Sequence, residues 1–231
     1  MPERFEPKIE ILPKSQREIW PLLAAAPGLS FVLYGGTAVA LHLGHRQSID
    51  FDFFRSAALD KKELETSFAF MRDAQTIQED ENTLVVIVPM PSGLVKVSFF
   101  GGLTIGRIND PLLTNDSTLL VASIEDLLTT KLKATLDRAE AKDYQDIVAM
   151  LSTGASLAQA LGAFAEMYRK DPGLPLRAIG YFKDGDLPSL PKTAQDVLRA
   201  ARDRVSDIPK IQIKRGPLAG GSAHGSSSVS Q

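Results

Sequence analysis

The pattern of apolar and polar positions changes near residue 120, and this change divides the chain into two parts. Before it, short apolar runs alternate with turn residues, which is typical of strands and short helices packed together. Strands are expected over 31–34, over 49–54 and, as antiparallel partners, within 74–100. Helices are expected over 14–25, 37–44 and 58–72. The first part is therefore predicted to be a small mixed α/β unit.

The second part has helical periodicity. Ser123 followed by Asp126 is a capping-box pattern, which predicts that a helix begins after Ser123 and runs through IEDLLTTKLKATLDRA. Further helices are expected over 143–152, 157–169 and 193–205. The end of the chain is rich in Gly and Ser and lacks a core pattern, which predicts disorder. We expect an α+β protein divided into residues 1–115, a helical domain over 116–212 and a disordered tail over 213–231.

Composition narrows the function mainly by exclusion. The 231 residues are 44% hydrophobic and 23% charged, which is ordinary for a globular protein with a good core. A net charge of −2 does not favour a broad nucleic-acid-binding face, although a local basic patch is compatible with it. The absence of cysteine excludes disulfides, thiolate zinc sites and a cysteine nucleophile. No apolar run is long enough to cross a bilayer and no signal-peptide pattern is present, so we expect a cytoplasmic protein without a membrane partner.

The segment YGGTAVALHLGHRQSIDFDFF (34–54) carries the strongest chemical signal. Gly35 and Gly36 lie between a strand and a helix, where backbone N–H groups can approach an anion and Thr37 can add a hydroxyl. Asp50 and Asp52 are two apart in a strand and therefore share a face. Two adjacent carboxylates repel each other, and a hard cation such as Mg²⁺ relieves that repulsion. Taken singly, the glycines also fit a plain tight turn and the acids a solvated strand face.

The two features together are more specific than either alone. A glycine pair, a short helix, a polar turn and then acid-x-acid on a strand form a layout that suits a phosphate and a metal ion. The turn contains Arg46 and Ser48, and the guanidinium of Arg46 could clamp phosphate. The alternative role for Arg46 is that of a surface arginine.

These residues resemble the signature of the DNA polymerase β-like nucleotidyltransferase superfamily and, more closely, the AbiEii/AbiGii toxin family. The similarity extends to KVSFF (96–100), to 123–151 and to YFKDGD (181–186), and covers about residues 25–190. It implies a nucleotidyltransferase fold with a small mixed sheet, flanking helices and a helical C-terminal domain. It also implies Mg²⁺-dependent transfer of a nucleoside monophosphate from an NTP to a hydroxyl of tRNA, another RNA or a protein. A member of this family would be the toxin of a toxin–antitoxin or phage-defence system, with an antitoxin as its partner.

The resemblance also assigns roles to individual residues. The family pattern has a lysine and a downstream aspartate that act with the metal site, and these match Lys131 and Asp146. Lys131 would contact the triphosphate or the developing charge, while Asp146 would orient Lys131 or the acceptor, or act as a base. The expected catalytic residues are Asp50, Asp52, Lys131 and Asp146, with Asp50 and Asp52 holding the metal. The expected nucleotide-binding residues are Gly35, Gly36, Thr37, Arg46, Ser48 and Lys131.

One departure from the superfamily pattern keeps other functions open. Ser98 stands where a third carboxylate commonly helps to hold metal and to deprotonate the acceptor. A serine is a poor metal ligand and no base at neutral pH, so a catalytically weak nucleotide-binding protein is one alternative. A nucleotidyltransferase that modifies a small molecule, of the antibiotic-modifying type, is a second, and a plain interaction domain is a third. His42 and His45 are expected to be helix-end side chains and not ligands.

Overall fold

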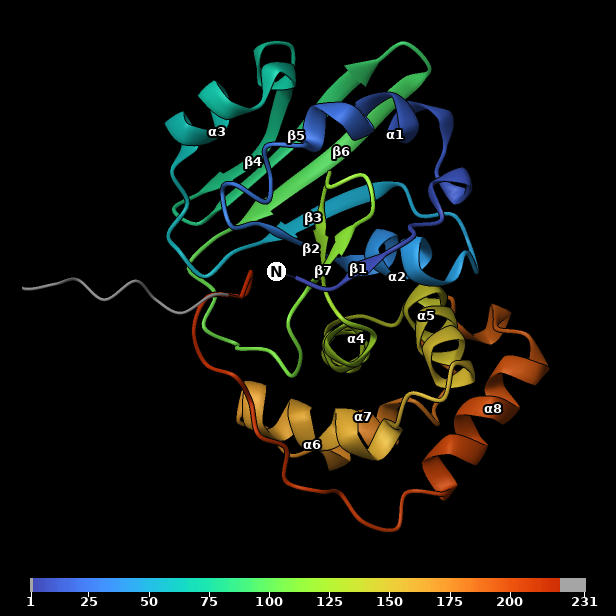
Figure 1. Cartoon of the computed structure of the whole chain (residues 1–231). Helices are drawn as coiled ribbons and strands as arrows, with labels where there is room; N and C mark the ends of the chain where they lie inside the picture. The colour runs from blue at the N-terminus through green and yellow to red at the C-terminus, as the bar shows by residue number, and fades with distance from the viewer. Residues whose placement is uncertain (1, 221–231) are drawn as a thin grey trace, which may run out of the picture.

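An eight-stranded mixed sheet forms the centre of the protein (Figure 1). The computed structural model describes residues 2–220. The strand order across the sheet is β1-β7-β8-β2-β3-β6-β5-β4. The strands are β1 (Arg4–Phe5), β2 (Val32–Tyr34), β3 (Asp50–Phe54), β4 (Gln75–Asp80), β5 (Thr83–Met90), β6 (Gly93–Phe100), β7 (Leu112–Thr114) and β8 (Leu120–Val121).

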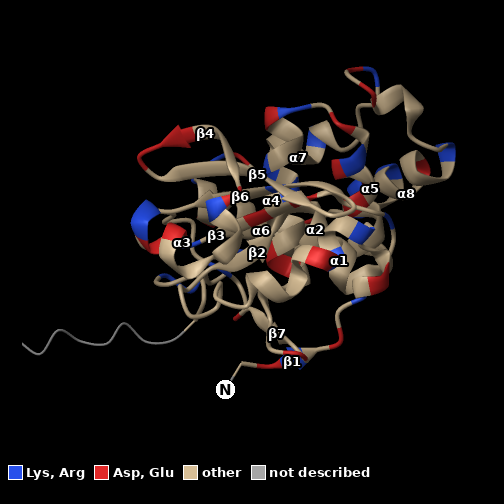
Figure 2. Ribbon diagram, turned by 90° about the horizontal axis from the view of Figure 1, so that it is seen from above, with Lys and Arg blue, Asp and Glu red and all other residues tan. Residues whose placement is uncertain are grey.

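Eight α-helices lie within the described residues. They are α1 (Lys14–Ile19), α2 (Gly35–Leu43), α3 (Lys61–Ser67), α4 (Ile124–Asp137), α5 (Ala141–Ser152), α6 (Leu157–Tyr168), α7 (Gly173–Ala178) and α8 (Lys192–Asp203). Helices α4 to α8 gather on the opposite side of the sheet from α1 and α3 (Figure 1). Of these, α6, α7 and α8 pack on α4 and α5 instead of on the sheet. In the view of Figure 2, Lys and Arg are interspersed with Asp and Glu along α3, α5 and α8, so these helices do not form a single basic face. None of the helices in residues 2–220 is long and apolar enough to span a membrane.

The alternation of β3 sets the two faces of the sheet. Phe51 and Phe53 are fully buried, and Phe53 stacks on Phe99 of β6 with ring centroids 5.5 Å apart. Aromatic pairs of this kind add to the stabilisation that burial provides. Because side chains alternate along a strand, Asp50 and Asp52 lie on the opposite face, as the sequence predicted.

Most predicted elements are present, with shifted ends. The helix after Ser123 is confirmed: the Ser123 hydroxyl accepts a hydrogen bond from the Asp126 N–H at 3.1 Å. The helices expected over 14–25 and 58–72 are shorter, because each passes into a 3-10 turn after its first six or seven residues. The short elements β1, β7, β8 and α7 were not predicted.

The expected domain limits fall inside continuous structure. Strand β8 lies beyond residue 115, yet it pairs in parallel with β2 at the centre of the sheet. Residues 213–220, which the sequence analysis assigned to the disordered tail, are packed: Lys214 forms a β-bridge with Arg107, and Leu218 is buried. The rest of the predicted tail, 221–231, lies outside the described residues. The division into a core and a helical domain stays a proposal.

Candidate active site

Asp50 and Asp52 face a cavity of about 670 Å³ on the side of the sheet where α4 and α5 pack. The cavity is bounded by the start of α2, the loop before β3, the strands β3 to β6, the second half of α4 and the start of α5. Five basic side chains and two acidic ones line it. The basic residues are Arg46, Lys96, Lys131, Arg138 and Lys142, and the acidic ones are Asp50 and Asp52.

The glycine pair allows close approach at the edge of this cavity. Gly35 has φ +75°, a region that glycine adopts without strain, and a Cβ there would collide with the carboxylate of Asp52. A Cβ on Gly36 would lie 2.7 Å from Nη2 of Arg46 and 2.9 Å from Oγ of Ser48. No side chain caps the start of α2. Its first N–H groups therefore have no side-chain acceptor, which leaves them open to an anion.

The nucleotide-binding residues expected from the sequence divide into three groups. Gly36, Arg46, Ser48 and Lys131 line the large cavity. Gly35 lines a smaller neighbouring cavity. Thr37 lines neither, because its side chain is fully buried and its hydroxyl donates a hydrogen bond to the backbone carbonyl of Asp50. This bond joins α2 to the start of β3, and the expected contact of Thr37 with a nucleotide stays a prediction.

Strand β6 places two different side chains opposite the acids. Lys96 pairs with Asp50, and its Nζ lies 3.5 Å from Oδ2 of that aspartate. Ser98 is buried and pairs with Asp52. Burial raises the pKa of the Asp52 carboxyl and the charge of Asp50 adds to that rise, while a hydrogen bond from Ser98 opposes it. The two acids are therefore under the mutual repulsion that the sequence predicted.

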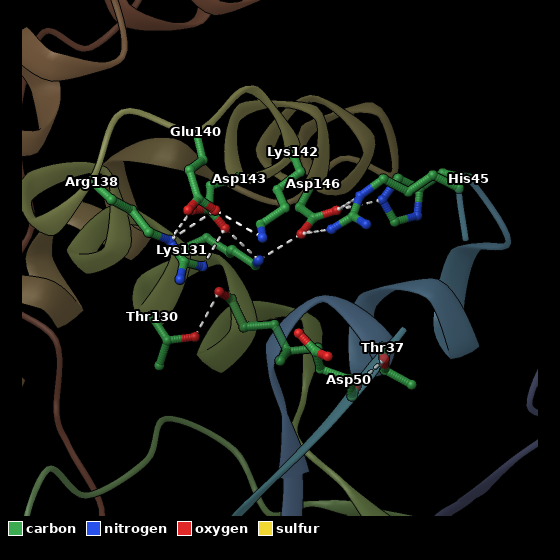
Figure 3. Close-up of polar contacts among 12 residues, drawn as sticks. Thr37, His45, Asp50, Thr130, Lys131, Arg138, Glu140, Lys142, Asp143 and Asp146 are labelled. Carbon is green, nitrogen blue, oxygen red and sulfur yellow. Dashed lines mark hydrogen bonds and ion pairs between the residues drawn. The ribbon is translucent and has the colours of Figure 1, made fainter. Parts of the chain in front are cut away.

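Lys131 lies within a buried ionic cluster (Figure 3). Its Nζ is 2.7 Å from Oδ1 of Asp143 and 2.6 Å from Oδ2 of Asp146, and all three side chains are almost inaccessible to solvent. An ammonium group has three protons, so two are directed at these carboxylates and one is left for a ligand in the cavity. Asp143 also accepts hydrogen bonds from Arg138, at 2.8 Å from Nε and 3.2 Å from Nη2.

Asp146 does not line the cavity but contacts two of the basic side chains that do, Arg46 and Lys131. It accepts two hydrogen bonds of 2.7 Å from Arg46 and one of 2.7 Å from Nε2 of His45, besides its contact with Lys131. Burial would raise the pKa of Asp146, but these hydrogen bonds and the charge of Lys131 lower it to about 2. The carboxylate is fully buried and is not among the side chains that line the cavity. Of the roles expected for Asp146, the geometry favours orientation of Lys131, because each carboxylate oxygen already has two partners. The contact with Arg46 was not expected.

Several residues of the site were missed by sequence reasoning. Lys96, Arg138 and Lys142 line the cavity, and Asp143 holds Lys131 in place. His45, which the sequence analysis treated as a helix-end side chain, contacts Asp146, whereas His42 lies apart and stacks on Phe5. Lys96 could have been found from the alternation of β6. Ser98 was already expected at the acid pair, and Lys96, two positions before it in the strand, faces the same side.

The acid pair fits a hard divalent cation. Asp50 and Asp52 offer carboxylate oxygens, which Mg²⁺ prefers, from adjacent same-face positions. In the part of the chain that the structure describes, no group of three or more Asp, Glu or His side chains could hold a metal by itself. An ion bound here would therefore complete its shell with substrate oxygens and water, as Mg²⁺ commonly does at phosphate sites.

Comparison with solved structures identifies the class of this fold. The structure is similar to a protein of H. pylori described as a nucleotidyltransferase, with a TM-score of 0.53 and 19% identity over 82% of this chain and 91% of that one. It is also similar to MenT4, a nucleotidyltransferase toxin of Mycobacterium tuberculosis H37Rv, with a TM-score of 0.56 and 15% identity over 82% of each chain. The protein therefore has the nucleotidyltransferase fold.

The sequence narrows this class to one family. Residues 22–214 match the family described as "Nucleotidyl transferase AbiEii toxin, Type IV TA system", and the chain belongs to this family of nucleotidyltransferase enzymes. An uncharacterized protein of Aquifex aeolicus (strain VF5) is 26% identical over 178 residues, which are 75% of this chain and 84% of that protein. The recognition made on residues 34–54 and 123–151 is confirmed.

Proposed function

We propose that this protein transfers a nucleoside monophosphate from an NTP to an acceptor hydroxyl, with Mg²⁺ held by Asp50 and Asp52. The observation that carries the proposal is one cavity in which this acid pair faces a wall of basic side chains next to the glycine turn. Such a site can hold a polyphosphate and a divalent ion together, and phosphoryl chemistry depends chiefly on positioning and charge stabilisation.

The basic wall would bind the triphosphate. Gly36 and the start of α2 offer N–H groups, Ser48 offers a hydroxyl and Arg46 offers the donors that Asp146 does not occupy. Lys131 would direct its remaining proton at the phosphate that is attacked or at the leaving pyrophosphate. Because Asp143 and Asp146 fix the ammonium group, this donor would need little reorganisation during the reaction.

A bound Mg²⁺ would neutralise charge on the phosphates as the bond to pyrophosphate breaks. The acceptor hydroxyl would approach from the β6 side, near Ser98 and Lys96. Serine is no base at neutral pH, so the proton of the acceptor would pass to a carboxylate of β3 or to water.

Membership of a type IV toxin–antitoxin family supports a toxin role with a cognate antitoxin. RNA, tRNA included, is the acceptor that the family resemblance of the sequence implies, and it is the first acceptor to test. Expression of the wild-type chain in a bacterial host is expected to slow growth, and expression of the Asp50→Ala variant is not. Equal growth of both cultures would argue against toxicity and would leave the chemistry to be tested in vitro.

The decisive experiment follows radiolabel from the α-phosphate of each NTP into total RNA in the presence of Mg²⁺. The proposal is supported if RNA becomes labelled with the wild-type protein and with Asp73→Asn but not with Asp50→Ala. Asp73 is an exposed acid outside the cavity. Label in small molecules only would favour an antibiotic-modifying type of enzyme. Mg²⁺-dependent NTP binding without any pyrophosphate release would favour a nucleotide-binding protein that has lost turnover, for which Ser98 is the structural reason.

A further inference from the structure

A second cavity of about 260 Å³ adjoins the first. The two cavities share four lining residues, which are Asp52, Phe100, Lys131 and Arg138. The second cavity begins at Gly35, so it opens from the same glycine turn that borders the first. A ligand whose phosphates lie in the large cavity can therefore extend past Asp52 into the small one.

Aromatic rings form one side of the second cavity. Phe54 stacks on Tyr34 with ring centroids 4.7 Å apart and an interplanar angle of 16°. Phe100 meets Phe54 edge to face at 5.4 Å. All three rings line the cavity, and Thr130 and Ala134 of α4 lie among the other lining residues. Flat aromatic surfaces of this kind are where nucleic-acid bases stack in proteins.

The charges of the two cavities differ. The large cavity has five basic against two acidic lining residues, which suits a polyanion. The small cavity has two of each: Lys131 and Arg138 against Asp52 and Asp137. Because its charges balance and its volume is less than half that of the neighbour, the small cavity suits an uncharged, flat group in place of a second phosphate.

We propose that the small cavity, between Gly35 and Ala134, holds the nucleobase of the NTP and determines which NTP is used. This inference rests on the proposed function. The triphosphate lies over Gly36 and Arg46, the α-phosphate lies at Asp52 and the base lies against Phe54 and Phe100. The β6 side of the large cavity then remains free for the acceptor.

Arg138 provides the polar contact that distinguishes one base from another. Its Nε and Nη2 donate to Asp143, which fixes the plane of the guanidinium, while about half of the side chain stays exposed at the shared rim of the cavities. An anchored guanidinium can donate to a base carbonyl or ring nitrogen and reject a base that presents a donor there.

The test compares two probes in the presence of Mg²⁺ and the absence of acceptor: inorganic tripolyphosphate and each of the four NTPs. The wild-type protein is expected to bind at least one NTP about tenfold more tightly than tripolyphosphate, as one stacked base can provide. Phe54→Leu, which removes the flat ring, and Ala134→Leu, which fills the cavity, are expected to reduce this ratio to about one and to leave tripolyphosphate affinity unchanged. Phe5→Leu is the matched control, since Phe5 stacks on His42 and lines neither cavity.

The outcomes separate this inference from the proposed function. A wild-type preference for one NTP that survives in both Phe54→Leu and Ala134→Leu overturns the base assignment and leaves the proposed function standing. The same holds if the wild-type protein binds every NTP no more tightly than tripolyphosphate. Failure of the wild-type protein to bind either probe overturns both. If one variant also loses affinity for tripolyphosphate, its residue affects the whole site. The ratio of NTP to tripolyphosphate affinity in the other variant then decides whether the base assignment stands.

Discussion

At the scale of single residues, a buried carboxylate that does not line the cavity holds two of the basic side chains that do. Asp146 holds Arg46 by two hydrogen bonds and shares Lys131 with Asp143. Replacing one partner of a buried ionic cluster leaves the remaining charges unpaired, which commonly costs about 3 kcal/mol or more. Asp146→Asn is therefore expected to lower the free energy of unfolding by about that amount and to abolish transfer activity. Asp73→Asn replaces an exposed residue and should change neither the free energy of unfolding, measured by urea denaturation, nor the activity, measured by label transfer.

The same carboxylate predicts how stability depends on pH. The pKa of Asp146 is lowered in the folded protein to about 2, from an unfolded value of about 4. Since protonation disfavours the fold, the contribution of this group is fully present above about pH 4. It is lost as the pH falls from about 4 to 2, and amounts to about 2 kcal/mol. Urea titrations across that range should show a shallower decline in Asp146→Asn than in the wild-type protein. Parallel declines would show that Asp146 is not the group responsible.

Gly36 offers a sharper test of the phosphate site. A methyl group there would meet Arg46 and Ser48 at under 3 Å, so Gly36→Ala should displace both from the cavity. NTP affinity is expected to fall at least tenfold, with the free energy of unfolding changed by no more than about 1 kcal/mol, because the atoms that the methyl group meets are the ends of flexible side chains, which can move aside. Gly28→Ala is the control, since a Cβ there meets only a backbone oxygen at an ordinary 3.5 Å. Unchanged NTP affinity, measured by calorimetry, would remove Gly36 from the nucleotide site.

The spatial relations that the sequence predicted and those it missed differ in one physical respect. Gly35, Gly36, Asp50 and Asp52 lie within 20 residues of each other, and strand and turn geometry relates them directly. The contact of Arg46 with Asp146 joins residues 100 apart, so only the packing of α5 against α2, which precedes Arg46, creates it. Periodicity carries no information about such a pairing. The expectation that Asp146 orients Lys131 came from the family resemblance, and Asp143 was not expected as a second partner.

At the scale of elements, α4 positions Lys131, and its start is fixed by a single cap. The Ser123 hydroxyl accepts from the Asp126 N–H, and the same hydroxyl donates to the Asp126 carboxylate at 2.7 Å. Loss of an N-cap costs about 1 kcal/mol. Ser123→Ala is expected to lower the free energy of unfolding by about 1–2 kcal/mol and to reduce transfer activity less than Asp146→Asn does. Ser156→Ala at the start of α6, outside the cavity, is a matched cap control whose activity should not change.

Elements with a clear period were predicted, and of the strands with two or three residues only β2 was, from its apolar run before the glycine pair. Strand β3 has alternating burial, and α4 to α6 have enough turns to show an apolar stripe. Strands β1, β7 and β8 have two or three residues each, too few for a period to be seen. They exist because neighbouring strands supply their hydrogen bonds, as β8 pairs with β2.

At the scale of the whole molecule, the chain returns at its C-terminal end to the sheet where it began. Arg107 forms a two-way backbone bridge with Lys214 and donates from Nη1 to the carbonyl of Pro217 at 2.6 Å. The backbone N–H of Leu218 donates to the Ser56 hydroxyl at 3.1 Å, and the Leu218 side chain is buried. These contacts join the last described segment to loops that leave β3 and precede β7, so the segment is part of the folded unit.

Two truncations test that conclusion against the tail predicted from composition. Ending the chain after Gln212 removes the Arg107 bridge and exposes the pocket that Leu218 fills. Burying a leucine side chain contributes about 2 kcal/mol and the lost hydrogen bonds add to this, so the melting temperature should fall by several degrees. Ending the chain after Gly220 removes only residues 221–231 and should leave the melting temperature and the transfer activity unchanged. If both truncations behave like the full chain, residues 213–220 contribute nothing to the fold, and the limit predicted at residue 213 was the better description.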